Sequence, residues 1–246
     1  MLKFLKCYLV YRLIMKLSIV IPAYNEAERL PAMLLDLKTF LNENDIDSEV
    51  IVVNDGSKDN TVNVIKDFFT DFKNIKLINN SENKGKGFAV KTGMLEAIGD
   101  YKMFADADGA TPFKEILKML PELKNGNDVV IASRAMKDSR IKTSAFCKFR
   151  GRIFNFLVNK ILGLDLTDMQ CGFKLFSKKA ADIVFANQSL DGFAFDIEIL
   201  HKAKKNGFSI KEVPVVWNNI KGSKVRGVRD PLKMFFSIFK VKFFNH

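Results

Sequence analysis

Cysteine and histidine are scarce in this chain of 246 residues. It has three cysteines, Cys7, Cys147 and Cys171, and two histidines. The odd number, the wide spacing and the lack of a CxxC pair argue against a disulfide framework and against a zinc site. We therefore expect a protein that works in a reducing, cytoplasmic setting.

Two common phosphate-binding signatures do not occur either. The sequence contains no GxxxxGK[ST] loop and no GxGxxG fingerprint, which disfavours an ATP-binding loop and a dinucleotide-binding domain. Its glycine-rich stretch, NKGKG at residues 83–87, follows neither pattern. The two lysines of this stretch, and the helix expected after it, still favour an anion such as a diphosphate.

No stretch reaches the length that a membrane-spanning helix requires. The apolar ends are residues 1–14 and 231–244, and a helix of this length rises about 21 Å, against a hydrocarbon core of about 30 Å. A signal peptide is not expected, because a core strand follows residues 1–14 without a small-residue cleavage site. Met15 is an alternative start to Met1.

The positive charge is concentrated at the two ends. The formal net charge is +11 and the pI about 9.5, yet residues 1–16 carry +4 and residues 218–246 carry +6, which leaves +1 for the 201 residues between them. A nucleic-acid partner is not expected, because the excess charge lies among Phe and Leu at the ends and no recognised binding motif occurs.

The C-terminal segment has an amphipathic pattern. As a helix, residues 231–244 place on one face the apolar side chains of Leu232, Phe235, Phe236, Phe239 and Phe243. Basic residues beside a Phe-rich face are typical of a helix that lies in the plane of an anionic membrane surface. Packing of this face on the domain is the alternative, and the two can be combined.

The body of the chain alternates strand and helix patterns. Apolar, β-branched runs predict strands at residues 16–22, 49–54, 75–79, 101–105 and 128–133. This alternation predicts an α/β fold with a Rossmann-like, mostly parallel sheet flanked by helices. A further strand is expected at 173–177, and residues 210–217 fit an edge strand because Pro214 interrupts them. We expect one domain, residues 17–217, between two basic amphipathic segments, residues 1–16 and 218–246.

Polar motifs follow the strands at their carboxyl ends, where the ligands of parallel α/β sheets bind. The residues expected on this rim are Tyr24, Asn25, Glu26, Asp55, Gly56, Ser57, Lys84, Gly85, Lys86, Asp106 and Asp108. Many of them are also ordinary turn residues. Their joint placement nevertheless predicts a ligand-binding site.

A pair of carboxylates, Asp106 and Asp108, follows the strand at 101–105 and precedes Gly109. Alternate residues of an extended chain point the same way, so both carboxylates can face one point beyond the strand. Carboxylate oxygens suit Mg²⁺ or Mn²⁺, which completes its coordination with water and substrate phosphates. A solvated turn is the alternative interpretation of the same residues.

Eight motifs resemble the inverting glycosyltransferases of family 2, and the resemblance covers roughly residues 17–230. They are IPAYNE, VVNDGSKDNT, NKGKG, ADADGATPF, SR, DMQCGFKLF, GFAFDIEIL and EVPVVW. ADADGAT and QCGFKLF are most similar to the dolichyl-phosphate β-glucosyltransferase branch of this family. The resemblance implies a GT-A fold and a metal-dependent hexosyltransferase that uses Mg²⁺ or Mn²⁺, a nucleoside-diphosphate sugar and a polyprenyl phosphate.

The resemblance also assigns donor-site roles by position. It implies that the uridine is held by Pro22, Tyr24, Glu26 and Asp55, that the ribose and diphosphate lie near Lys84, Lys86 and Asp106, and that the metal is engaged by Asp106 and Asp108. The donor usual in this branch is UDP-glucose. GDP-mannose is the alternative donor, because the glucose and mannose branches share most of these motifs.

The implied reaction is attack of an acceptor phosphate oxygen on the anomeric carbon, with inversion and release of UDP. A phosphate monoester has a second pKa near 6, so it needs a general base less than a sugar hydroxyl does. Asp196 in the FDIE segment is the first candidate for a base, and Asp168 is the second. Both have structural alternatives, Asp196 as a helix cap and Asp168 as a turn residue.

The acceptor phosphate requires cations, and an arginine fork matches phosphate oxygens bidentately. The candidates are Arg134, Arg150, Arg152 and Lys174 in the body, and Lys224 and Arg226 in a basic flap over the site. For the flap, a solvated charge run is the alternative.

Eukaryotic members of the family carry an N-terminal transmembrane anchor, which this sequence does not show. We therefore expect peripheral attachment to the cytoplasmic face of a membrane through the two basic ends. The rival hypothesis is a family 2 enzyme with a soluble hydroxyl acceptor, which would require a true base at Asp196. A non-catalytic scaffold is disfavoured because Asp55, Asp106 and Asp108 are intact.

Overall fold

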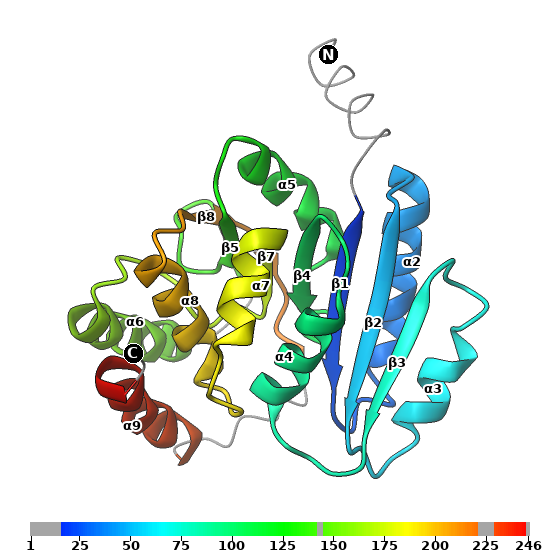
Figure 1. Cartoon of the computed structure of the whole chain (residues 1–246), viewed down its shortest axis with the longest axis horizontal. Coiled ribbons are helices and arrows are strands. Elements are labelled where there is room, and N and C mark those ends of the chain that lie inside the picture. The colour runs from blue at the N-terminus through cyan, green and yellow to red at the C-terminus, as the bar shows by residue number, and fades with distance from the viewer. Residues whose placement is uncertain (1–15, 142–144, 221–228, 245–246) are drawn as a thin grey trace.

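The computed structural model describes residues 16–141, 145–220 and 229–244 (Figure 1). Its strands are β1 (Leu17–Ala23), β2 (Ser48–Asp55), β3 (Ile75–Asn80), β4 (Tyr101–Ala105), β5 (Val129–Ser133), β6 (Arg140–Ile141), β7 (Phe173–Ser177), β8 (Ile210–Pro214) and β9 (Val216–Trp217). Its helices are α2 (Leu30–Asn44), α3 (Thr61–Asp67), α4 (Lys86–Glu96), the 3₁₀ turn η1 (Phe113–Glu115), α5 (Ile116–Lys124), α6 (Ala145–Leu162), α7 (Lys178–Ala186), α8 (Phe195–Lys205) and α9 (Arg229–Phe244).

Seven of these strands form one sheet in the order β3-β2-β1-β4-β7-β5-β8. Strand β7 runs antiparallel to β4 and β5, and the other neighbours are parallel. The predicted mostly parallel sheet is thus confirmed. The edge prediction holds for β8, which is outermost, whereas β9 leaves the sheet after Pro214 and pairs with β6.

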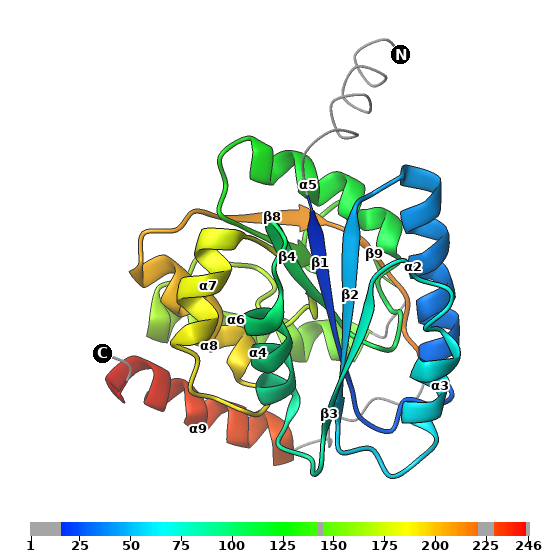
Figure 2. The same ribbon diagram turned by 45° about the vertical axis from the view of Figure 1, so that its right-hand side comes forward.

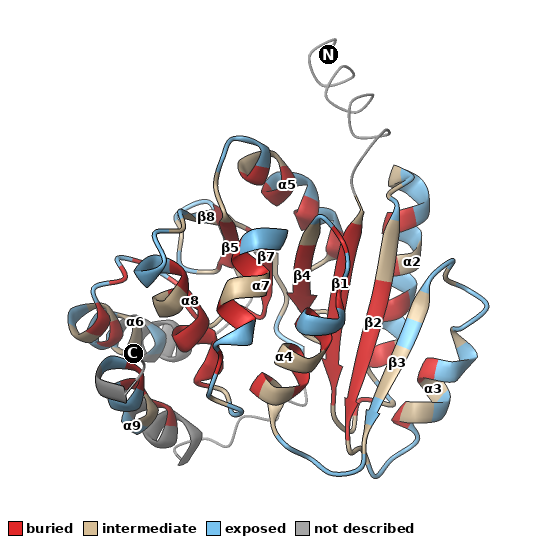
Figure 3. Cartoon of the chain, viewed as in Figure 1, coloured by how far each residue is buried: buried red, intermediate tan, exposed pale blue. Residues whose placement is uncertain are grey.

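Apolar side chains fill both faces of the sheet, as the continuous hydrophobic runs predict for strands with helices on both sides. In β1, Ile19 and Ile21 face one side and Val20 faces the other, and all three are fully buried. Helices α2, α3 and α5 cover the first face, and α4, α7 and α8 cover the second (Figures 1 and 2). Strands β1, β2 and β4 are buried along most of their length (Figure 3).

Two helices begin later than their sequence patterns predict. Helix α2 begins at Leu30 and α3 at Thr61, whereas the helical patterns of the sequence begin three residues earlier, at Ala27 and Lys58. The segments before them are joined by hydrogen bonds, because Glu26 N donates to Thr61 Oγ1 (2.8 Å) and Ala27 N to Asp59 Oδ2 (3.2 Å). The residues after β1 and β2 therefore form two linked loops at the rim instead of additional helical turns.

Of the two alternatives for the apolar face of α9, packing on the domain does not hold for Phe236 and Phe239, because the helix buries other residues. Met234, Ile238 and Val241 are buried, whereas Phe236 and Phe239 are 67% and 40% exposed. Ile238 and Val241 belong to the core on the α8 side of the sheet, and α9 contacts both α6 and α8. The other apolar residues of the predicted face have side chains outside the described part of the structure, namely Leu232, Phe235 and Phe243.

Candidate active site

Asp55, at the end of β2, fixes the glycine-rich loop that precedes α4. Its Oδ1 accepts hydrogen bonds from Lys84 N (3.0 Å) and Asn80 Nδ2 (3.2 Å), and its Oδ2 accepts one from Gly85 N (2.8 Å). The carboxylate is almost fully buried. The structure therefore shows that Asp55 positions the glycine-rich loop, a role that the sequence did not reveal. The uridine contact implied by the family resemblance stays a prediction.

The glycines of the NKGKG loop make room for the segment that precedes α8. A Cβ atom on Gly85 would lie 2.4 Å from Asp191 O, and one on Gly87 would lie 2.4 Å from Leu190 O. Asp191 O also accepts hydrogen bonds from Gly87 N (2.7 Å) and Phe88 N (3.2 Å). These two N–H groups at the start of α4 are satisfied within the protein, so they are not available to bind an anion.

Asp106 directly follows β4 and contacts Gly172, the residue before β7. Its N–H donates to Gly172 O (2.9 Å), and a Cβ atom on Gly172 would come within 2.1 Å of Asp106 Oδ2. Asp108 accepts a hydrogen bond from Ala110 N (3.0 Å), and Gly109 adopts a φ of +67°. This turn holds both carboxylates at the carboxyl end of β4, as predicted from the sequence.

Lys86, the first residue of α4, points to two carboxylates. Its Nζ is 2.7 Å from Asp106 Oδ1 and 3.9 Å from Asp196 Oδ2. Burial alone lowers the pKa of this ammonium, but the charges of Asp106 and Asp196 outweigh burial and hold the pKa above its ordinary value. Burial, followed by the charge of Asp106, raises the pKa of Asp108.

The Asp106 and Asp108 pair fits a divalent cation. Both supply carboxylate oxygens, the hard donors that Mg²⁺ and Mn²⁺ prefer, and Asp106 already attracts the positive charge of Lys86. Within residues 16–141, 145–220 and 229–244, no cluster of three His, Cys, Asp or Glu could hold a metal by itself. The remaining ligands would therefore come from water and substrate phosphates.

Asp196 is held by a buried lysine. It lies in the first turn of α8 without capping it, is 3% exposed, and forms an ion pair and hydrogen bond with the ammonium of Lys174. Lys174 is itself fully buried and also donates to Cys171 O (2.7 Å). This differs from the prediction for Lys174, because a buried ammonium that is paired with Asp196 is not presented to an acceptor phosphate.

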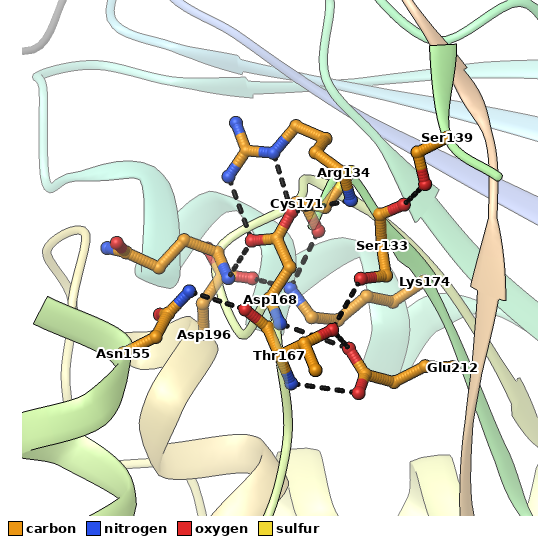
Figure 4. Close-up of polar contacts among 11 residues, drawn as sticks. Ser133, Arg134, Ser139, Asn155, Thr167, Asp168, Cys171, Lys174, Asp196 and Glu212 are labelled. Atoms are coloured by element: carbon orange, nitrogen blue, oxygen red, sulfur yellow. Dashed lines mark hydrogen bonds and ion pairs between the residues drawn. The ribbon is translucent and has the colours of Figure 1, made fainter. Parts of the chain in front are cut away.

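Arg134 and Asp168 form a bidentate ion pair (Figure 4). Asp168 Oδ2 accepts from Arg134 Nε (2.7 Å) and N (2.9 Å), and Oδ1 accepts from Nη2 (2.9 Å). The guanidinium carbon lies 5.6 Å from the centre of the Trp217 ring. Burial favours a higher pKa for Asp168, but Arg134 outweighs it and holds the pKa below its ordinary value. Asp168 is therefore a poor proton acceptor, contrary to its candidacy as a base.

Glu212, on β8, fixes the backbone of Asp168 and of the preceding residue by hydrogen bonds (Figure 4). Its carboxylate accepts from Thr167 N (2.8 Å), Thr167 Oγ1 (2.8 Å) and Asp168 N (3.0 Å). The Thr167 hydroxyl also lies 2.9 Å from Ser133 Oγ, beside Arg134. The sequence indicated Glu212 only as part of the EVPVVW motif, because its partners lie more than forty residues away in the chain.

The residues after β1 contain a second arginine that sequence reasoning missed. Glu26 is buried and pairs through both carboxylate oxygens with Arg29, with Nε 2.6 Å from Oε2. Burial opposes the charge of Arg29, but Glu26, Asp108 and Asp106 together hold its pKa above the ordinary value. Arg29 therefore contributes positive charge beside the carboxylate pair.

For the other predicted site residues, the structure shows only the burial or the position in the chain, apart from one ring contact of Lys84. Pro22 is buried within β1, Tyr24 is half-buried directly after it, and Lys84 is exposed with its Nζ 4.8 Å from the centre of the Phe88 ring. Arg150 and Arg152 lie on α6 with side chains outside the described part of the structure, and Lys224 and Arg226 lie outside the described residues.

Comparison with known sequences supports the predicted family. Residues 18–185 match the family model described as Glycosyl transferase family 2. The chain is 36% identical over 241 residues to the dolichyl-phosphate beta-glucosyltransferase of Dictyostelium discoideum, covering 92% of this chain and 74% of that relative. The protein of the same name from Homo sapiens is 36% identical over 225 residues, covering 85% of this chain and 69% of the relative.

Solved structures share the fold. Glucosyl-3-phosphoglycerate synthase from Mycobacterium tuberculosis, in complex with Mn²⁺, UDP-glucose and phosphoglyceric acid, has a TM-score of 0.68 at 16% identity, covering 95% of this chain and 80% of that chain. Mannosyl-3-phosphoglycerate synthase from Rubrobacter xylanophilus has a TM-score of 0.68 at 18% identity, covering 92% and 72%. The predicted GT-A fold is thus confirmed. With the family model matched over residues 18–185, this chain belongs to glycosyl transferase family 2.

Proposed function

We propose that this glycosyltransferase moves glucose from UDP-glucose to dolichyl phosphate and forms a β-linked lipid-phosphate sugar. The observation that carries the proposal is the 36% identity, over 92% of the chain, to a protein named dolichyl-phosphate beta-glucosyltransferase. The arrangement of the rim supports it, because candidate donor residues, a carboxylate pair and a fixed arginine all follow the carboxyl ends of strands in the same sheet.

The donor site that we propose lies over the ends of β1, β2 and β4. Pro22, Tyr24, Glu26 and Asp55 would bind the uridine, and Lys84 and Lys86 would neutralise the diphosphate. The linked loops after β1 and β2, and the hold of Asp55 on the glycine-rich loop, support a preformed site. Asp106 and Asp108 would hold Mg²⁺ or Mn²⁺, which when bound stabilises the negative charge on the departing diphosphate.

The acceptor phosphate would meet Arg134. Its side chain is 32% exposed, and the bidentate pair with Asp168 fixes the plane of the guanidinium while leaving further N–H groups to bind phosphate oxygens. One phosphate oxygen then bonds to the anomeric carbon as the bond from that carbon to the diphosphate breaks, and the electron pair leaves with UDP. The anionic acceptor is its own nucleophile.

This reaction assigns positioning roles to both aspartates that were predicted as bases. Asp168 holds Arg134, and Asp196 pairs with Lys174 and lies near Lys86. Both carboxylates are thus already occupied by cationic partners within the protein. Such an arrangement suits an acceptor that arrives already deprotonated, and it disfavours the rival in which a neutral sugar hydroxyl attacks.

We also propose that the enzyme works while bound peripherally to a membrane. Within the described residues, no helix combines the length and apolarity needed to cross a bilayer. Two helices in contact, α6 and α9, expose the large apolar side chains of Ile153, Phe156, Leu157, Phe236 and Phe239. Lys160, Lys240 and Lys242 on the same helices are exposed. This combination is typical of an interfacial surface that binds anionic lipid.

The test is sugar transfer from radiolabelled UDP-glucose to dolichyl phosphate in detergent with Mg²⁺ or Mn²⁺. We expect lipid-extractable label that requires the metal and is lost in Asp108→Asn. GDP-mannose, assayed in parallel, should give no such label. Label from GDP-mannose alone would overturn the assigned donor, and transfer only to water-soluble hydroxyl acceptors would overturn the assigned acceptor.

A further inference from the structure

Lys86 occupies a position between carboxylates from two different elements. Asp106 follows β4, and Asp196 lies in the first turn of α8. The Lys86 ammonium is in contact with Asp106 Oδ1 at 2.7 Å and lies 3.9 Å from Asp196 Oδ2. Its backbone is fixed, because Gly85 and Gly87 on either side pack against the segment before α8. The side chain therefore reaches either carboxylate from one backbone position.

The two carboxylates differ in their other partners. Asp196 has a lysine of its own, since its Oδ1 pairs with Lys174, which is fully buried. The side chain of Asp106 is 34% exposed and is close to Asp108, whose pKa its charge helps to raise. Lys86 thus provides a nearby positive charge for the carboxylate that faces Asp108 and solvent, and Asp196 offers a second acceptor for the same ammonium.

We propose that Lys86 is an exchangeable counter-ion, which pairs with Asp106 until a divalent cation binds that carboxylate and then transfers to Asp196. The inference rests on the proposed metal site at Asp106 and Asp108. A divalent cation bound through Asp106 would lie a few ångströms from the ammonium, and two positive charges at that separation repel strongly. Asp196 Oδ2, already within 3.9 Å, accepts the displaced ammonium without a change in the backbone.

The exchange would couple the metal to the donor. A metal ion that binds alone must break the Lys86–Asp106 ion pair, whereas a metal ion that arrives with a diphosphate brings negative charge that Lys86 can also bind. The metal and the nucleotide should therefore strengthen each other's binding, and the coupling is reciprocal because it is a free energy. Lys86 then disfavours binding of the metal without the nucleotide, in addition to its role as a diphosphate ligand.

The test measures Mn²⁺ binding to the full chain by electron paramagnetic resonance of the free ion, with and without UDP. Lys86→Gln should bind Mn²⁺ in the absence of UDP about tenfold more tightly than the parent, because no ammonium competes for Asp106. UDP should then strengthen Mn²⁺ binding less than it does in the parent. Lys86→Arg, which keeps the charge, should behave as the parent does.

A matched control is Lys84→Gln, because Lys84 is a lysine of the same loop whose Nζ lies over the Phe88 ring. Its Mn²⁺ affinity in the absence of UDP should equal that of the parent. Unchanged or weaker Mn²⁺ binding in Lys86→Gln would overturn the exchange. Tighter binding in Lys84→Gln as well would also overturn it, because general loss of positive charge would then explain both variants.

A further variant separates this inference from the metal site on which it rests. Asp108→Asn, combined with Lys86→Gln, should abolish the tightened Mn²⁺ binding. If the double variant keeps that binding, the cation lies elsewhere and the proposed metal site is wrong. If Asp108→Asn in the parent abolishes UDP-dependent Mn²⁺ binding while Lys86→Gln behaves as the parent does, the metal site stands and the exchange is wrong.

Discussion

Gly172 and Asp106 are in direct contact, and a Cβ atom on Gly172 would come within 2.1 Å of Asp106 Oδ2. The carbonyl of Gly172 also accepts the N–H of Asp106. The backbone before β7 therefore forms the surface against which the proposed metal-binding carboxylate rests. An added methyl group must displace either this backbone or the carboxylate.

We predict that Gly172→Ala lowers kcat by about a hundredfold, because a misplacement of about 1 Å in an active site costs about that much. The free energy of unfolding should fall by only about 1–3 kcal/mol, as is usual for overpacking. Sugar-transfer kinetics and urea unfolding measure the two effects. Gly192→Ala is the control, since a Cβ atom there has no neighbour within 4 Å; equal losses in both variants would contradict the argument.

The same region shows what the sequence could predict and what it could not. The carboxylate pair was recognisable because Asp106 and Asp108 follow an apolar strand and precede a turn at Gly109. The role of Gly172 was not, because the contact depends on antiparallel pairing of β7 with β4, between residues far apart in the chain. Local sequence patterns indicate where strands lie in the chain. They do not indicate which strands pair with one another, because pairing depends on the whole sheet.

Lys174 illustrates a second limit. Lysine is almost never fully buried unless it is paired, so its sequence position suggested a surface cation. In the structure it lies on central strand β7, and its ammonium reaches Asp196 on α8, twenty-two residues later in the chain. Nothing in the short-range pattern indicated this pair, because the partners meet only when α8 packs on the sheet.

The Arg134 fork provides a test of the acceptor site. Arg134→Lys keeps the charge but cannot maintain the bidentate pair with Asp168 and bind a phosphate in the same plane. We expect the Michaelis constant for dolichyl phosphate to rise about tenfold while that for UDP-glucose changes little. Steady-state kinetics with each substrate varied in turn measure both constants.

Arg140→Lys is the matched control for this prediction, because Arg140 is exposed on β6, the next strand in the chain after Arg134. It should leave both Michaelis constants unchanged. Unaltered acceptor kinetics in Arg134→Lys would remove Arg134 from the acceptor site.

Asp168 predicts a pH dependence of stability. Its folded-state pKa lies below the ordinary value of 3.8 because of Arg134, so the ionised form stabilises the fold above pH 3.8, and this contribution is lost as the pH falls through the folded-state pKa. Asp168→Asn should lower the free energy of unfolding by about 3 kcal/mol at pH 7, since it breaks a largely buried pair.

Urea unfolding of the parent and of Asp168→Asn, from pH 7 to pH 3, measures this dependence. The difference between them should be constant down to about pH 5 and should shrink below about pH 4. A difference that does not change with pH would show that Asp168 stabilises the fold through packing and not through its charge.

Cys171 should be chemically inert in the folded protein. The thiol is buried, and burial raises its pKa to about 12, so the reactive thiolate is scarce at neutral pH. We expect iodoacetamide at pH 8 to leave Cys171 unmodified until the chain is unfolded in urea. Peptide mass mapping follows each cysteine separately, and rapid modification of Cys171 without denaturant would contradict its placement beside Lys174.

The membrane proposal predicts a selective effect of the exposed phenylalanines of α9. Phe236→Ser combined with Phe239→Ser should reduce binding to vesicles of phosphatidylcholine and phosphatidylserine at least about tenfold, because two phenyl groups no longer enter the interface. The buried face of α9, which contains Ile238 and Val241, is unchanged, so the fold should persist. Flotation measures the binding, and circular dichroism checks the fold.

The control replaces two apolar residues that are as exposed but lie away from α6 and α9. Leu35 on α2 is 57% exposed and Ile98, after α4, is 64% exposed. Leu35→Ser with Ile98→Ser removes a similar amount of exposed apolar surface. It should float as the parent does, because neither residue belongs to the proposed membrane-binding surface. Equal loss of binding in both double variants would exclude a specific α9 surface. If the Phe236 and Phe239 variant loses flotation but still transfers glucose to acceptor in detergent, α9 acts in membrane attachment and not in the chemical step.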